Sequence, residues 1–212
     1  MPKFWIFDLD NTLHNATPHI FPHINRSMTA YLQEYLQLDE AAANALRMDY
    51  WQRYGATLSG LMKHHDTDPH HFLHYTHQFP ALPEMVLREP RLRRTLQQLP
   101  GKKIVFSNAP LAYAQAVLKL LGVADLFDDV FAIEQAKFRP KPQRAGFWAL
   151  LRQHHLSAQQ CVMVEDSVDN LRTAKRLGMR TVWVGNALRK PVFVDVKIKD
   201  ITELPRNLAA LN

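Results

Sequence analysis

Two aspartates, Asp8 and Asp10, follow directly after an apolar run at the start of the chain. Side chains two residues apart in an extended chain point the same way, so these two carboxylates would converge. At a separation of 4 Å their repulsion is about 4 kcal/mol in a medium of effective dielectric 20. We therefore expect a positive group to lie between them.

Further polar side chains stand at the ends of other predicted strands. Ser107 and Asn108 follow one strand, and Glu165 and Asp166 end a later one. Lys141 lies in a basic stretch just before a predicted helix. The carboxyl ends of parallel strands gather at one edge of a sheet, so these groups would meet there. Such a set of acids, a hydroxyl and a lysine is able to handle a phosphate group.

The elements that would position these residues alternate between strands and helices. Residues 4–7 form an apolar run without polar alternation, which is typical of a strand buried on both faces. We predict further strands at 103–106, 130–133, 161–164, 180–184 and 194–198, and helices at 88–99, 111–121, 142–154, 168–177 and from 200 onward. This alternation implies right-handed crossovers and a parallel sheet, so we predict an α/β fold.

Residues 14–84 interrupt this pattern, because they contain no convincing buried strand. They predict helices at 23–38, 39–54, 57–65 and 69–78, with Asp39 and Asp68 as N-caps of the second and fourth. We therefore predict one core domain built from residues 1–13 plus 85–212, and an all-helical cap domain of residues 14–84 inserted into it.

The composition bounds the class of protein. The chain has 212 residues and a net charge of +6, and its scattered basic residues favour small anionic substrates over nucleic acid. Cys161 is the lone cysteine, so no internal disulfide can form and a reducing compartment is expected. No secretory signal is expected, and no stretch approaches the roughly 20 apolar residues of a membrane span. We expect a cytoplasmic protein that does not bind membranes, and the oligomeric state stays open.

Four short motifs occur in order along nearly the whole chain: Asp8-x-Asp10-x-Thr12, Val105-Phe106-Ser107-Asn108, Lys141-Pro142 and Glu165-Asp166-Ser167-x-x-Asn170. Together they resemble the motifs of the haloacid dehalogenase-like (HAD) hydrolase superfamily. The resemblance implies a Rossmann-like core, and the helical insert resembles the cap of subfamily I. The stretch Tyr54-Gly55-x-Thr57-x-x-Gly60-Leu61 in the insert is further similar to pyrimidine 5′-nucleotidase-type members.

The resemblance implies a phosphatase that works through an aspartyl-phosphate. Asp8 would be the nucleophile, and Asp10 would protonate the leaving oxygen and then activate a water molecule. Ser107 and the main-chain amide of Asn108 would bind phosphate oxygens. Lys141 would offset negative charge on the transferring group.

The resemblance also implies a Mg²⁺ cofactor, since a carboxylate that attacks a phosphate needs its repulsion screened. The ligands would be the carboxylates of Asp8 and Asp166 and the main-chain carbonyl of Asp10, while Glu165 would hold a metal-bound water. Asp169 is open between a supporting role at this metal and a favourable charge in the first turn of a helix. Lys137 is the alternative to Lys141 as the active lysine.

The expected substrate is a small phosphorylated metabolite, and a pyrimidine nucleoside 5′-monophosphate is favoured, with Arg53 and Tyr54 of the cap as candidate contacts. The alternatives are a phosphomutase or sugar-phosphate phosphatase of the same superfamily, and a non-catalytic nucleotide- or phosphoprotein-binding module. Dehalogenase chemistry is disfavoured, because Asp10 is present to protonate an alkoxide. Histidines 70, 74 and 77 share a helix face, which leaves a zinc site as an alternative to a solvated surface.

Overall fold

A six-stranded parallel sheet forms the centre of the computed structural model, which describes residues 4–211. Its strands run in the order β3-β2-β1-β4-β5-β6. They are β1 Phe4–Phe7, β2 Lys102–Phe106, β3 Asp129–Phe131, β4 Cys161–Glu165, β5 Arg180–Val184 and β6 Val196–Ile198. The central strand β1 pairs with β2 on one side and β4 on the other, which confirms the predicted α/β fold with a parallel sheet.

Helices cover both faces of the sheet. They are α6 Leu92–Gln97, α7 Leu111–Leu121, α8 Arg144–Gln153 and α9 Val168–Arg176, with short 3₁₀ helices at Ala124–Leu126 and Ala158–Gln160 and a longer one at Ile201–Leu211. Side chains of β1 alternate between the two faces. Trp5 and Phe7 pack in the cluster that contains Val117 of α7, whereas Ile6 packs in the cluster that contains Phe147 of α8. This burial on both faces is the reason that β1 has no polar alternation.

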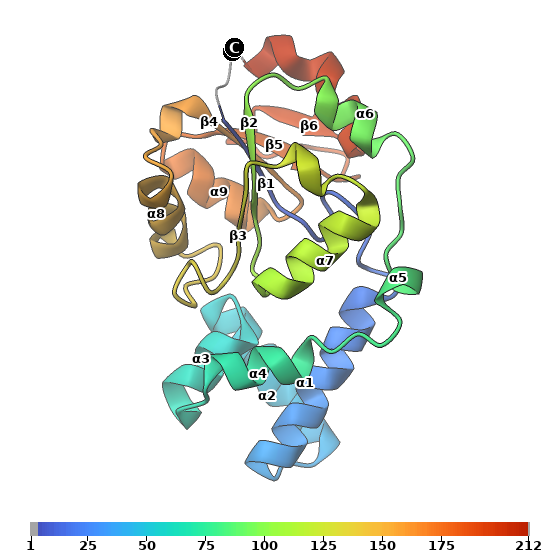
Figure 1. Ribbon diagram of the computed structural model, residues 1–212. Coiled ribbons are helices and arrows are strands. Elements are labelled where there is room, and N and C mark those ends of the chain that lie inside the picture. The colour runs from blue at the N-terminus through green and yellow to red at the C-terminus, as the bar shows by residue number, and fades with distance from the viewer. Residues whose placement is uncertain (1–3, 212) are drawn as a thin grey trace.

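A group of helices follows β1 in the chain: α1 Ile20–Leu36, α2 Glu40–Tyr54, α3 Thr57–His65, α4 Pro69–Thr76 and the short α5 Leu82–Met85. Figure 1 shows α1 to α4 gathered beside one end of the sheet. They pack around a small cluster in which Leu32, Tyr50, Leu61 and Phe72 are buried, and Ile133 from the segment after β3 belongs to the same cluster. The division into a core of residues 1–13 plus 85–212 and a cap of residues 14–84 stays a prediction.

The helix ends follow their local sequence. Asp39 accepts a hydrogen bond from the amide of Ala42 at 2.8 Å, and Asp68 accepts one from the amide of His70 at 2.9 Å, which confirms both predicted N-caps. Gly55 ends α2 with a positive φ of 80°. A Cβ atom at this position would lie 3.1 Å from Cδ of Pro142, so the end of α2 packs closely against the loop that carries Lys141.

Several predicted boundaries were wrong. The helix predicted at 142–154 begins at Arg144, because Gln143 is extended and its amide donates to the Pro140 carbonyl at 2.8 Å in a turn that precedes the helix. The helix predicted at 88–99 begins at Leu92, and the one predicted at 23–38 begins at Ile20. The terminal helix is a 3₁₀ helix with Pro205 inside it, where the missing N–H removes a helical donor.

Candidate active site

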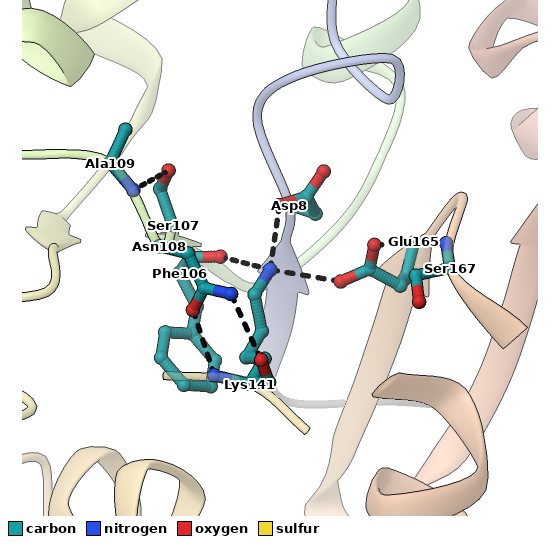
Figure 2. A network of polar contacts seen from close by, with 8 residues as sticks. All are labelled: Asp8, Phe106, Ser107, Asn108, Ala109, Lys141, Glu165 and Ser167. Atoms are coloured by element: carbon teal, nitrogen blue, oxygen red, sulfur yellow. Dashed lines mark hydrogen bonds and ion pairs between the residues drawn. The ribbon is translucent and has the colours of Figure 1, made fainter. Parts of the chain in front are cut away.

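The ammonium group of Lys141 lies at the centre of a cluster of polar contacts (Figure 2). Its Nζ is 2.6 Å from Oδ1 of Asp8 and 2.8 Å from Oε2 of Glu165, and it also donates to the main-chain oxygen of Phe106 at 2.7 Å. The Lys141 side chain is only 1% exposed. The positive group expected beside Asp8 is therefore Lys141, but it lies between Asp8 and Glu165 and not between Asp8 and Asp10.

The loop after β2 fixes the main chain on which Lys141 stands. The side-chain oxygen of Asn108 accepts from the Lys141 amide at 2.8 Å, and its side-chain nitrogen donates to the Lys141 carbonyl at 3.0 Å. This carboxamide clamp was missed in the sequence, where only the main-chain amide of Asn108 is assigned a role. Ser107 beside it is 2% exposed, and its hydroxyl accepts from the amide of Ala109 at 3.0 Å.

Burial dominates the electrostatics of the cluster. Burial and the charge of Glu165 raise the pKa of Asp8 from 3.8 to about 7, and the nearby Lys141 opposes this shift. Burial likewise raises the pKa of Glu165 from 4.5 to about 7. Burial lowers the pKa of Lys141, but the carboxylates of Asp8 and Glu165 outweigh it and raise that pKa, so Lys141 stays charged. One lysine therefore does not fully offset the buried acids.

Asp166 extends this acidic group. Oxygen atoms of Asp8, Glu165 and Asp166 lie within 4.8 Å of one another. Burial raises the pKa of Asp166, as it does for its two neighbours. Hard carboxylate oxygens at this spacing are the donors that Mg²⁺ prefers, and a divalent ion would relieve the charge that Lys141 leaves unbalanced. The donor set therefore fits the predicted metal.

Asp10 points its carboxylate at a different pair of residues. Its Oδ1 accepts a hydrogen bond from the Tyr113 hydroxyl at 2.7 Å and lies 2.9 Å from Nε2 of His14. Both partners were missed in the sequence. Tyr113 is 103 positions away on α7, so nothing local indicates the contact. His14 is only four positions away, and this short spacing was the available signal.

Asn11 shapes the loop between β1 and α1. It adopts a positive φ of 63°, a conformation that asparagine tolerates better than most residues. Its side-chain oxygen accepts from the amides of Ala16 at 3.0 Å and Thr17 at 3.2 Å. The buried hydroxyl of Thr12 has no hydrogen-bond partner among residues 4–211, so Asn11 and not Thr12 supplies the polar contacts that hold this loop.

Three predicted residues lie outside these contacts. Arg53 pairs with Asp49 at 2.7 Å and its side chain is 67% exposed. The hydroxyl of Tyr54 lies 2.7 Å from Nε2 of His64, within the helical group. Asp169 pairs with Arg172 on the surface of α9, which agrees with a charge in the first helical turn and not with a place among the carboxylates that could hold a metal.

The histidines at 70, 74 and 77 do not form a metal site in the part of the chain that the structure describes. His70 packs its ring edge-on against Phe138, and His74 contacts Gln78. Nδ1 of His77 lies 3.0 Å from the Thr76 hydroxyl. The zinc alternative therefore has no geometric support.

Known proteins place this arrangement in a family. A family model described as haloacid dehalogenase-like hydrolase matches residues 3–178. The chain belongs to this family. The fold agrees with that of a HAD phosphatase from Thermococcus onnurineus, at a TM-score of 0.66 and 24% identity over 98% of both chains.

Two curated relatives carry names from phosphate metabolism. Phosphoglycolate phosphatase of Rhodospirillum rubrum is 30% identical over 91% of this HAD chain and 83% of the relative. Phosphate metabolism protein 8 of Saccharomyces cerevisiae is 29% identical over 84% of this chain, which spans only 60% of that protein. These names agree with the predicted class, a phosphoric monoester hydrolase. The narrower resemblance to pyrimidine 5′-nucleotidases stays a prediction.

Among residues 4–211, no helix combines the length and the apolar character needed to cross a bilayer.

Proposed function

We propose that this HAD hydrolase is a Mg²⁺-dependent phosphomonoesterase that forms an aspartyl-phosphate on Asp8. The observation that carries this proposal is the contact of Asp8 with Lys141 at 2.6 Å, beside two further carboxylates of raised pKa. An anionic nucleophile and an anionic substrate can come together only where fixed positive groups offset their charge.

The first half-reaction would transfer the phosphoryl group to the protein. An oxygen of Asp8 attacks phosphorus while the bond from phosphorus to the leaving oxygen breaks. Asp10 gives its proton to that leaving oxygen, which departs as an alcohol. Lys141 and Ser107 would stabilise the charge on the transferring group, and Mg²⁺ held by Asp8, Asp166, the Asp10 carbonyl and, through water, Glu165 would supply further charge neutralisation.

The second half-reaction would return Asp8 to its starting state. A water molecule attacks phosphorus and gives a proton to the Asp10 carboxylate. The bond between the Asp8 oxygen and phosphorus then breaks, which releases inorganic phosphate and regenerates the Asp8 carboxylate. Asp10 thus ends the cycle with the proton that it lost in the first half-reaction.

The substrate class that we propose is a small phosphorylated metabolite. A pyrimidine nucleoside 5′-monophosphate is the first candidate, with Arg53 and Tyr54 at the end of α2 as its contacts. The end of α2 lies next to the Lys141 loop, since the Gln143 side chain donates to the Tyr54 carbonyl at 3.3 Å. A small acid or sugar phosphate is the second candidate, because the relative from R. rubrum is named for phosphoglycolate.

Turnover of p-nitrophenyl phosphate tests the proposed reaction. We expect activity with Mg²⁺, loss of activity in excess chelator, and no activity for Asp8→Asn. A folded wild-type protein that is inactive with Mg²⁺ would favour a non-catalytic phosphate-binding module. Phosphate release from CMP, UMP, phosphoglycolate and sugar phosphates then separates the substrate candidates, and the nucleotide proposal fails if CMP and UMP are no better than the others.

A further inference from the structure

We propose that His14 and Tyr113 are positioning residues that hold Asp10 with one defined carboxylate oxygen available for proton transfer. This inference rests on the proposed function, in which Asp10 exchanges a proton with the leaving group and then with water. It assigns a role to two residues that lie outside the four sequence motifs.

Both contacts are made to the same oxygen atom. The Tyr113 hydroxyl donates to Oδ1 of Asp10 at 2.7 Å, and Nε2 of His14 lies 2.9 Å from that same Oδ1. A carboxylate oxygen can only accept a hydrogen bond. His14 therefore carries a proton on Nε2 and donates it to Oδ1 of Asp10. Two donors that approach one oxygen from different elements restrict rotation of the carboxylate, so Oδ2 is the oxygen left to exchange a proton with substrate.

Both donors are buried, so neither can exchange its contact with Asp10 for a contact with water. The His14 side chain is fully buried, and its Nδ1 has no hydrogen-bond partner in the described part of the chain. A buried nitrogen without a hydrogen-bond partner is unfavourable, so core packing alone does not account for a histidine at this position. Tyr113 is 4% exposed. A phenol hydroxyl that meets a carboxylate oxygen donates its hydrogen to it, as the Tyr113 hydroxyl does to Asp10.

The segment between α4 and α5 holds the Tyr113 ring in place. Ring centroids of Phe79 and Tyr113 lie 5.1 Å apart, and those of His77 and Tyr113 lie 5.8 Å apart. His23 of α1 packs in turn on Phe79 at 4.8 Å. Tyr113 is thereby fixed from the side of the helical group as well as by its own helix, which leaves its hydroxyl little freedom to leave Asp10.

A positioning role predicts a specific dependence on the leaving group. An alkoxide is a poor leaving group and needs the proton of Asp10, whereas p-nitrophenolate departs readily without it. A misplaced Asp10 should therefore slow the phosphorylation step for an alkyl phosphate far more than for p-nitrophenyl phosphate. A general loss of packing would slow both substrates alike. The ratio of kcat/KM for the two substrates separates these cases, since kcat/KM reports the steps up to formation of the phospho-enzyme.

The experiment compares Tyr113→Phe, His14→Leu and His14→Gln with the wild-type holoenzyme in Mg²⁺, using glycerol phosphate and p-nitrophenyl phosphate. We expect Tyr113→Phe and His14→Leu to lower kcat/KM about tenfold for glycerol phosphate and at most about twofold for p-nitrophenyl phosphate. His14→Gln keeps an N–H donor and should restore part of the loss. Tyr31→Phe is the matched control, because it removes another buried hydroxyl, one that contacts His71 in the helical group.

The outcomes distinguish the two levels of the proposal. If the wild-type protein hydrolyses neither substrate, the result contradicts the proposed function and therefore also this inference. An active wild-type protein whose variants lose both activities equally, or lose neither, contradicts the positioning role alone. Thermal midpoints identify a variant that fails to fold, and in that case the milder Tyr113→Phe or His14→Gln provides the decisive ratio.

Discussion

At the scale of single residues, the site depends on charge balance around one buried lysine. Lys141 contacts two carboxylates, and both of them have a pKa raised to about 7 because burial outweighs the attraction of the lysine. Ionisation of both acids therefore lowers the stability of the folded protein unless a further positive charge is bound beside them. Such a balance suits a site that binds a cation and an anionic substrate.

Removal of Lys141 should show how strongly the site depends on it. Lys141→Met leaves two buried acids without their ammonium partner, so we expect a loss of about 3–5 kcal/mol in the free energy of unfolding at pH 7. Urea denaturation measures this loss, and turnover of p-nitrophenyl phosphate should fall below detection. Lys137→Met is the matched control, because Lys137 is exposed. Equal effects of the two substitutions would contradict the assignment of Lys141.

The raised pKa values also predict how stability changes with pH. Asp8 and Glu165 titrate near 4 when unfolded and at about 7 when folded, so the native state binds more protons between these values. Their contribution to stability is present at low pH and is lost as the pH rises toward 7. In chelator, the free energy of unfolding of wild type minus that of Asp8→Asn should therefore decrease from pH 5 to pH 7. A flat or rising difference would argue against carboxylates of raised pKa.

Mg²⁺ should reverse this loss. The ion binds carboxylates and not carboxylic acids, so we expect it to raise the thermal midpoint more at pH 7 than at pH 5. Asp166→Asn removes one of the three converging acids and should weaken the effect, whereas Asp169→Asn, on the exposed face of α9, should leave it unchanged. Differential scanning fluorimetry across a Mg²⁺ titration measures both. Equal shifts for the two variants would place the ion elsewhere.

At the scale of elements, local sequence patterns correctly predicted a buried strand and the starts of two helices. The unbroken apolar run of β1 indicated a buried strand, and Asp39 and Asp68 indicated the starts of α2 and α4, all as observed. Such local patterns do not predict contacts between segments that are far apart in the chain. The Tyr113 hydroxyl reaches Asp10 only because the first turn of α7 lies beside the loop after β1, which no local spacing indicates.

The start of α8 differs from the prediction for a local reason. A proline at position 142 favours a helix start there, but Gln143 is extended and its amide bonds to the Pro140 carbonyl. The contact that no local pattern shows is that of Asn108, whose side chain binds both polar groups of the Lys141 main chain. Asn108→Ala should therefore cost about 1–3 kcal/mol of stability and lower kcat, because Lys141 loses its support. Asn207→Ala removes one side-chain contact on the terminal 3₁₀ helix and serves as the control. If kcat is unaffected while stability falls, the clamp is purely structural.

The junction between α2 and the Lys141 loop is a second test at this scale. Gly55 and Gly122 both have positive φ values, of 80° and 69°. An added Cβ meets Pro142 at 3.1 Å at the first position and nothing within 4 Å at the second. Both Gly→Ala changes should cost about 1 kcal/mol through backbone strain. Only Gly55→Ala should also change KM or kcat, and identical kinetics for the two variants would show that the junction does not influence the site.

At the scale of the whole molecule, the parallel sheet explains why residues from distant parts of the chain meet. Asp8 follows β1, Ser107 and Asn108 follow β2, and Glu165 ends β4, and these three strands are neighbours in the sheet. The helical group stands beside the same end of the sheet (Figure 1). Closure of such a cap over a phosphate would exclude water from the first half-reaction, which suits a phospho-enzyme mechanism.

The central claim is that Asp8 becomes phosphorylated, and mass spectrometry tests it most directly. Asp10→Asn should still accept a phosphoryl group from p-nitrophenyl phosphate, whose leaving group needs no proton, but it should be slow to activate water. After acid quenching we therefore expect one phosphoryl group on the peptide that contains residue 8 in Asp10→Asn, and none in the Asp8→Asn, Asp10→Asn double variant. A phosphoryl group on another residue, or turnover by the double variant, would contradict the account.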